Sequence, residues 1–124
     1  MTMFRKKLGG QGEKHALGYL QKKGYQLITQ NYYNYIGEID LIMRDKKTIV
    51  FVEVKTKTEL EFGNPLEMID TRKQKKLLQC IKAYLHKNDL FEADVRIDAV
   101  SVVVDIWGNK LRIEHIENAV EDNN

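Results

Sequence analysis

Asp40, Glu53 and Lys55 are the residues whose types and spacing best suit chemistry in this sequence. They lie in two segments, residues 36–44 and 49–57, whose apolar residues and short polar connection predict a β-hairpin. A two-residue turn would place Asp40 directly opposite Glu53, with Cβ atoms about 4.5–5.5 Å apart. Lys55 would lie on the same face, two residues further along. Two adjacent carboxylates are suited to holding a hard divalent cation.

The hydrophobic pattern of the hairpin supports this register. It places Leu41 opposite Val52 and Ile39 opposite Val54, so that one face is entirely apolar. A shift of one residue would mix apolar and charged side chains, and register is well specified wherever one face is buried. The acidic pair is therefore expected on the face opposite these apolar residues.

Carboxylates that face each other across two strands repel, which destabilises the sheet. A solvated hairpin face would tolerate the repulsion, and this alternative stays open. Against it, Ile42 and Phe51 on the same face are apolar, which indicates that the face is partly covered. A bound Mg²⁺ would offset the repulsion, because this ion favours one or two carboxylates together with water and phosphate oxygens. Mn²⁺ is the alternative cation.

A third acid, Glu13, opens a predicted helix at residues 13–23, with Gly24 as its stop. Its spacing from Ala16 and Leu20 places it on the apolar stripe of that helix, which faces the core. A glutamate in a first turn is also favoured by the helix dipole. The dipole explains the position along the helix but not the inward direction.

The remaining elements must position these side chains. The pattern predicts a strand at residues 25–33, an amphipathic helix at 71–86, and strands at 94–105 and 111–116. The order α-β-β-β-α-β-β has a helix long enough to be a crossover connection, which implies an α/β fold with a mixed β-sheet flanked by helices. Less regular segments are expected as a loose arm at residues 1–10, a loop at 58–64, a short helical turn from Asn64-Pro65, and a frayed tail at 121–124.

Length and composition indicate one domain, residues 1–124, with 43% hydrophobic and 31% charged residues. No apolar run follows the basic start of the chain, so no signal peptide is predicted, and no stretch is long enough to span a bilayer. We therefore expect a cytoplasmic protein without a membrane partner. The single cysteine, Cys80, lies in a helical apolar pattern and is predicted to be a core residue.

Several classes of chemistry are disfavoured by what the sequence contains. Its three histidines, His15, His86 and His115, are scattered, and one cysteine cannot complete a zinc constellation with them. Neither a glycine-rich phosphate loop nor a Ser-His-Asp arrangement is present. ATP-driven chemistry and acyl transfer are therefore not expected.

Motifs spread from Gly12 to Ala119 together resemble the YraN family, bacterial proteins of uncharacterised activity related to archaeal Holliday junction resolvases of the PD-(D/E)xK nuclease superfamily. The motifs are Gly12-Glu13 with Ala16, Gly37-Glu38-Ile39-Asp40-Leu41-Ile42, Phe51-Val52-Glu53-Val54-Lys55-Thr56-Lys57, Phe62-Gly63-Asn64-Pro65, Lys73-Gln74 and Ile113-Glu114-His115-Ile116-Glu117-Asn118-Ala119. The resemblance implies a restriction-endonuclease-like fold. It also implies that Glu13, Asp40, Glu53 and Lys55 occupy the four catalytic-type positions.

Two positions depart from the family pattern. Ile39 stands where many nucleases of the superfamily have proline, and Lys57 stands where the family often has arginine. The lysine keeps the charge but loses the bidentate geometry for phosphate.

A phosphodiester-cleaving site built on these residues would hold Mg²⁺ with Asp40, Glu53 and the backbone carbonyl of Val54. Lys55 would orient the attacking water and stabilise charge in the transition state, and it could instead pair with Glu38. Glu13 would bind a second metal or a metal-bound water, and Glu38 is a weaker candidate for the same role.

Basic residues at the start of the long helix are candidates for phosphate contacts. These are Arg72, Lys73, Lys75 and Lys76, with Gln74 as a polar neighbour expected to reach the site and Lys57 on the hairpin. A solvated helical face is the alternative for the lysines. Tyr32, Tyr33 and Tyr35 could stack on unpaired bases, although strand packing is expected for at least one of them.

The sequence thus predicts a Mg²⁺-dependent endonuclease that acts on DNA, including branched or structured DNA. The first alternative is a non-catalytic nucleic-acid-binding protein on the same fold, and the second is an interaction or scaffold protein with a solvated charged hairpin. Because related resolvases cut two strands symmetrically, the resemblance also implies a homodimer.

Overall fold

The computed structural model describes residues 3–59 and 70–120, with side chains from residue 6 onward. Its elements are α1 (Met3–Lys22), β1 (Gln26–Tyr33), β2 (Glu38–Asp45), β3 (Thr48–Thr58), α2 (Thr71–Lys87), β4 (Asp94–Val104) and β5 (Lys110–Ile116). This order and the mixed α/β class confirm the sequence prediction. Most of the loop expected at 58–64, the helical turn at Asn64-Pro65 and the tail at 121–124 lie outside the described residues.

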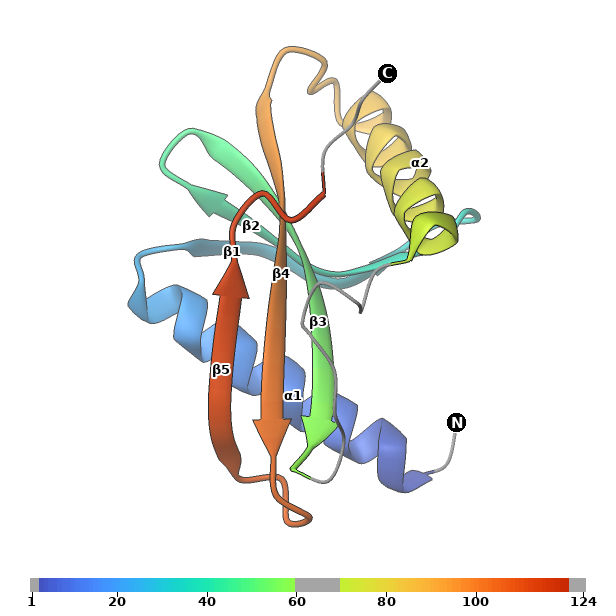
Figure 1. The fold of residues 1–124 in the computed structure, drawn as a ribbon. Coiled ribbons are helices and arrows are strands. Elements are labelled where there is room, and N and C mark those ends of the chain that lie inside the picture. The colour runs from blue at the N-terminus through green and yellow to red at the C-terminus, as the bar shows by residue number, and fades with distance from the viewer. Residues whose placement is uncertain (1–2, 60–69, 121–124) are drawn as a thin grey trace.

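The five strands form one sheet in the order β1-β2-β3-β4-β5. Neighbouring strands are antiparallel except β3 and β4, which pair in parallel along their whole length. A parallel pair needs a crossover connection, and α2 lies in the connection between these two strands. In Figure 1, β1 crosses the view while β3, β4 and β5 run along each other, so the sheet is strongly twisted.

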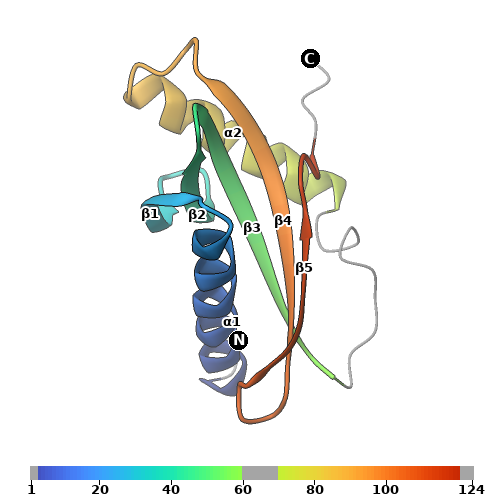
Figure 2. The same ribbon diagram turned by 90° about the vertical axis from the view of Figure 1, so that its left-hand side faces the viewer.

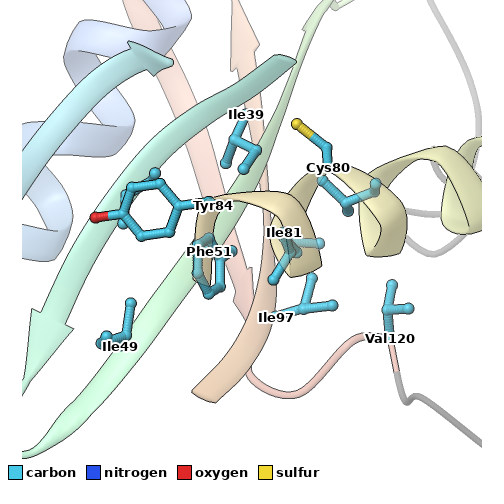
Figure 3. Packing of buried hydrophobic residues seen from close by; sticks show 11 residues of the cluster. Ile39, Ile49, Phe51, Cys80, Ile81, Tyr84, Ile97 and Val120 are labelled. Carbon is cyan, nitrogen blue, oxygen red and sulfur yellow. The ribbon is translucent and has the colours of Figure 1, made fainter. Parts of the chain in front are cut away.

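Each helix packs on the sheet through its own apolar cluster. Leu77, Cys80, Ile81 and Tyr84 of α2 contact one cluster, which includes Phe51. Figure 3 shows Cys80, Ile81 and Tyr84 of α2 lying over the strands, and the burial of Cys80 confirms its prediction as a core residue.

The second cluster joins α1 to the central strands. Leu8, Ala16 and Leu20 of α1 pack against strand residues that include Val52 and Val100. Figure 2 shows α1 running beside β3. Helix α2 lies apart from α1 and packs in the other cluster. No helix in the described part of the chain is long and apolar enough to cross a membrane.

Helix α1 begins much earlier than predicted. The expected loose arm at residues 1–10 is wrong for residues 3–10, which belong to α1. The prediction failed because Gly9 and Gly10 have low helix propensity. Burial of Leu8, which is 4% exposed, against the strands supplies the stabilisation that propensity lacks.

Gly12 lets α1 approach β3 closely. A Cβ atom at this position would collide with the hydroxyl of Thr56 and lie 2.9 Å from the Thr56 Cβ. At Gly18, in the same helix, a Cβ would meet nothing within 4 Å. The two glycines therefore have different roles: one is required by packing and the other is not.

We predict opposite effects for alanine at these two positions. Gly12→Ala should lower the free energy of unfolding by about 1–3 kcal/mol, because the stiff Thr56 side chain must move. Gly18→Ala should raise it by up to about 1 kcal/mol through helix propensity. Urea unfolding of both variants measures this, and equal effects would contradict the close approach of α1 to β3.

Candidate metal centre

The strands β2 and β3 separate at Asp40. Their paired residues run from Asp45 opposite Thr48 to Leu41 opposite Val52, which confirms the predicted register over that stretch. In the described hairpin the pairing ends there, and the backbone N–H of Val54 instead donates to the Asp40 carboxylate, with 2.7 Å between nitrogen and Oδ2. A side chain of β2 thus bonds to the β3 backbone where the ladder has ended.

The side-chain alternation of β2 also breaks at Asp40. Ile39 packs in the cluster on the α2 side, whereas Leu41 packs in the cluster on the α1 side. The prediction that Ile39 shares an apolar face with Leu41 is therefore wrong. The cause is the twist of β2 at its separation from β3, which a regular two-residue alternation does not include.

A cavity of about 260 Å³ lies at this separation, and it brings the four predicted catalytic residues together. Its charged lining residues are Glu13, Glu38, Asp40, Glu53, Lys55, Lys57 and Lys73, with the backbone segment from Val54 to Thr58 beside them. Asp40 is only 8% exposed. Glu13 comes from α1 and Lys73 from α2, so both helices contribute to one site.

The carboxyl groups of Asp40 and Glu53 are in hydrogen-bond contact, and both have raised pKa values. For each, burial is the largest cause. Repulsion by Asp40 adds to the rise at Glu53, while Lys73 opposes it. At Asp40 the Val54 N–H acts in the opposite direction, because it stabilises the carboxylate. The pair therefore retains a proton more readily than exposed acids do.

Glu13 lines the same cavity from the side of α1. Burial, followed by repulsion from Asp40 and Glu38, raises the pKa of Glu13 to about 7. Its side chain is half-buried and lines the cavity, as its position on the apolar stripe predicted. Three acids with raised pKa values thus face a common space.

The donor set suits Mg²⁺ better than a metal that needs a complete protein cage. Among the described residues, no group of three or more His, Cys, Asp or Glu side chains is placed to hold a metal ion. Mg²⁺ needs only one or two carboxylates and completes its shell with waters and phosphate oxygens. Asp40 and Glu53, with the Val54 backbone between Glu53 and Lys55, fit that requirement.

The predicted basic residues divide into two groups. Lys57 and Lys73 line the carboxylate cavity, and Lys73 and Lys76 line an adjoining cavity of about 240 Å³ that also contains Glu53. Arg72, Gln74 and Lys75 line neither of these two cavities. The N-terminal turn of α2 is fixed by Asp70, whose side chain accepts a hydrogen bond from the Lys73 N–H at 2.8 Å.

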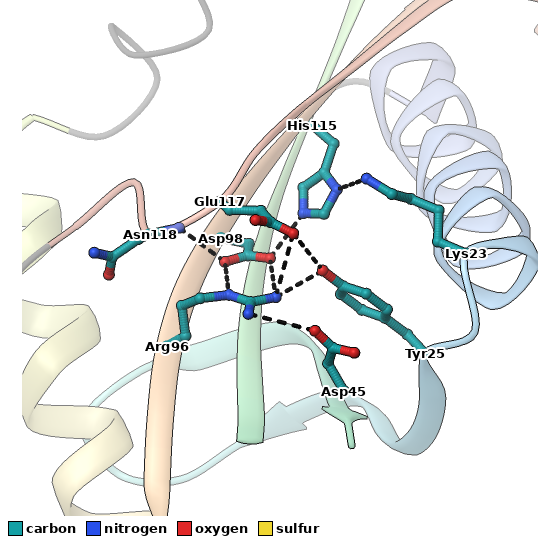
Figure 4. A network of polar contacts seen from close by, with 8 residues as sticks. All are labelled: Lys23, Tyr25, Asp45, Arg96, Asp98, His115, Glu117 and Asn118. Atoms are coloured by element: carbon teal, nitrogen blue, oxygen red, sulfur yellow. Dashed lines mark hydrogen bonds and ion pairs between the residues drawn. The ribbon is translucent and has the colours of Figure 1, made fainter. Parts of the chain in front are cut away.

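A second polar cluster, centred on Asp98, was not found from the sequence. Asp98 is fully buried and accepts from Arg96 Nε at 2.9 Å and from the Asn118 N–H at 3.0 Å. Its Oδ2 lies 2.7 Å from His115 Nε2, and the other ring nitrogen of His115 lies 2.8 Å from Lys23 Nζ. Figure 4 shows that this network joins the end of α1 to β4 and β5.

The network around Asp98 is a structural connection rather than a second reaction site. The side chains of Asp98 and His115 are 0% and 1% exposed, so no substrate reaches them. In the described part of the chain every buried side-chain nitrogen and oxygen has a hydrogen-bond partner. The available signal was the pair Arg96 and Asp98 inside a strand whose other central residues are mostly apolar, since a charged residue must be paired when buried.

Comparison with known proteins places the chain among proteins of uncharacterised activity. The family model described as "Uncharacterised protein family UPF0102" matches residues 12–102. A UPF0102 protein of Carboxydothermus hydrogenoformans is 34% identical over 119 residues, covering 96% of this chain and 99% of that protein. One from Caldanaerobacter subterraneus subsp. tengcongensis is 42% identical over 118 residues, covering 93% and 95% respectively. One from Clostridioides difficile is 38% identical over 117 residues, covering 94% and 99%.

The raised pKa values predict that the metal-free protein becomes more stable on acidification. Glu53 and Glu13 bind protons more tightly in the folded chain, so the free energy of unfolding should rise as the pH falls from about 8 to about 5. Glu53→Gln should be more stable than the original chain at pH 8, by roughly 1–3 kcal/mol, and the difference should shrink at pH 5.

Urea unfolding in EDTA across this pH range is the measurement. Glu114→Gln, which changes an exposed glutamate on β5, is the matched control and should follow the original chain at every pH. A stability difference between Glu53→Gln and the original chain that does not vary with pH would contradict the buried acidic pair.

Asp98→Asn should destabilise the fold by about 3–5 kcal/mol, because Arg96 loses its buried counterion. Asp94→Asn, at the exposed start of the same strand, should change the free energy of unfolding by less than about 0.5 kcal/mol. Thermal and urea unfolding at neutral pH compare the two. Equal stability of both variants would show that the Asp98 network does not hold the strands together.

Proposed function

This chain belongs to the uncharacterised protein family UPF0102, and we propose that it is a Mg²⁺-dependent nuclease that hydrolyses phosphodiester bonds in DNA. The predicted membership of the YraN family is confirmed by this assignment. The nuclease activity is our proposal, and it rests on the site formed by Asp40, Glu53 and Lys55.

The observation that supports it most strongly is the contact between the buried carboxyl group of Asp40 and the half-buried one of Glu53, beside cationic side chains. Burial raises the pKa of both carboxyl groups, and repulsion by Asp40 raises the pKa of Glu53 further. A pair of this kind contributes little to folding, since buried like charges are unfavourable without a proton or a cation between them. A cavity open to substrate, with Lys55 and Lys73 in its lining, gives such a pair a use in binding a metal and a phosphate.

Asp40 and Glu53 would hold the metal, with the Val54 carbonyl as a further ligand. Mg²⁺ at this position would polarise the phosphate and lower the pKa of a bound water. Lys55, an exposed side chain in the cavity lining, would orient the attacking water and stabilise the charge that develops on the phosphate. Glu13 would accept a hydrogen bond from a metal-bound water or contribute to a second metal.

Phosphate groups on either side of the reacting one would meet the lysines around the cavity. Lys57 and Lys73 line it directly, and Lys76 lines the adjoining cavity. Contacts of this kind supply affinity that does not depend on base sequence and that weakens with salt. They fit an enzyme that recognises the shape of its nucleic acid more than its sequence.

The proposal predicts different effects for a change in the metal ligand Asp40 and for a change in Lys55. Asp40→Asn should abolish both Mn²⁺ binding and DNA cleavage, while its side-chain oxygen can still accept from the Val54 N–H and preserve the fold. Lys55→Met should bind Mn²⁺ but cleave about 100-fold more slowly. Calorimetric Mn²⁺ titration and cleavage of linear, single-stranded and branched DNA are measured in parallel.

Glu114→Gln serves as the control, because it removes an exposed carboxylate outside the cavity, and it should cleave at the original rate. Cleavage that persists in Asp40→Asn would overturn the assignment of the site. Salt-sensitive DNA binding without cleavage of any substrate by the original chain would favour the non-catalytic alternative.

A further inference from the structure

A groove lies between the β1–β2 connection and the C-terminal half of α2. Its volume is about 790 Å³, and its walls differ in character. The β1–β2 wall presents aromatic and apolar groups, including Tyr33, Tyr35 and Ile36, whereas the α2 wall presents Lys82, His86 and Lys87. We call it the tyrosine groove.

The aromatic wall is exposed to a degree that packing does not explain. Tyr33 is 76% and Tyr35 is 93% exposed. Tyr32 behaves differently, because its ring packs edge-on against Tyr84 with 5.1 Å between centroids. Strand packing therefore accounts for Tyr32, as the sequence predicted for at least one of the three, and it leaves the other two rings facing outward.

The connection that carries these rings is held in place by Asn34. Its side-chain oxygen accepts hydrogen bonds from the N–H groups of Ile36 and Gly37, at 2.9 and 3.2 Å. The same oxygen lies 3.4 Å from the Cys80 sulfur, which donates to it from α2. Because both walls are tied together at Asn34, the groove has a defined width before any ligand arrives.

The charge of the groove favours an anionic partner. Lys82 and Lys87 are exposed on the α2 wall, and among the described residues that line the groove none is Asp or Glu. Aromatic faces beside ammonium groups, without acids, are the combination that binds bases by stacking and phosphates by charge.

The groove continues along α2 toward the candidate metal centre. Lys73 and Lys76 near the start of this helix line cavities that contain Glu53, and Lys87 at its end lines the tyrosine groove. The span from Lys73 to Lys87 is about 21 Å at the helical rise, or roughly six stacked nucleotides. Gly37 in the middle cavity directly follows Ile36 in the groove, so the three spaces lie in succession.

We propose that the tyrosine groove binds an unpaired polynucleotide strand, with Tyr33 and Tyr35 stacking on its bases and Lys82 and Lys87 contacting its phosphates. This inference rests on the proposed function, since it takes nucleic acid as the ligand, and it adds that the ligand has an unpaired stretch next to the cleavage site. A duplex would not use the tyrosines, because its bases already stack on each other and offer no free face to an aromatic ring.

Binding is tested with the full chain in EDTA, so that cleavage does not interfere. Fluorescence anisotropy measures affinity for labelled oligothymidylate of about 12 nucleotides, a length within the range of single-strand sites. A matching oligouridylate and a duplex of the same length are measured beside it. The uridylate separates DNA from RNA, and the duplex separates stacking from simple charge attraction.

Tyr33→Ala and Tyr35→Ala should each weaken single-strand binding by about 10-fold. Tyr33→Phe and Tyr35→Phe keep a stacking face and should retain affinity within about twofold. Duplex affinity should not change in any of these variants. Trp107→Ala removes another exposed aromatic ring, 75% exposed in the β4–β5 turn, and should leave single-strand binding unaltered.

Unchanged single-strand affinity in both tyrosine variants would overturn the inference, as would equal losses on single strand and duplex or the same loss in Trp107→Ala. Absence of single-strand binding by the original chain would overturn it too. These outcomes are separate from those of the nuclease proposal. Single-strand binding in EDTA that depends on the tyrosines would support the groove even if Mg²⁺ produces no cleavage. Metal-dependent cleavage would support the nuclease proposal even if the groove binds no strand.

Discussion

Two carboxyl groups held against each other at the separation of β2 and β3 are the constraint on which the rest of this structure depends. Burial and mutual repulsion make Asp40 and Glu53 unfavourable as a charged pair. The apolar clusters on both faces of the sheet must therefore hold the strands that carry them. The Val54 N–H fixes Asp40 from within the sheet, and α1 and α2 bring Glu13 and Lys73 to it from outside. The site is thus assembled by the whole fold and not by one loop.

Much of this arrangement could be predicted from the sequence because local patterns determine it. The alternation around Leu41 and Val52 specified the hairpin register, and the register placed the acids near each other. The apolar stripe of α1 directed Glu13 inward. The break at Asp40 could not be predicted, since it arises where the twist of the sheet overrides the two-residue alternation that placed Ile39 beside Leu41.

Interactions between distant segments were the ones that sequence patterns missed. Residues 3–10 looked unstructured by propensity, yet Leu8 finds a buried position against the strands. The partners of Asp98 come from Arg96 on its own strand and from His115 and Asn118 further along the chain. Neither contact leaves a periodic signal, because each depends on how separate elements meet. The spacing of the site residues likewise suggests a metal-dependent reaction, but spacing alone does not determine what each residue does.

The parallel pairing of β3 with β4 affects the stage of folding at which the repulsion between Asp40 and Glu53 arises. The β2–β3 hairpin is local and can form within microseconds, whereas β4 joins it only after the long connection through α2 has closed. Until then Asp40 and Glu53 remain hydrated, and their repulsion is weak. The repulsion within the acidic pair therefore arises only after this connection has closed. We expect variants that remove the repulsion to slow unfolding of the chain more than they speed its folding.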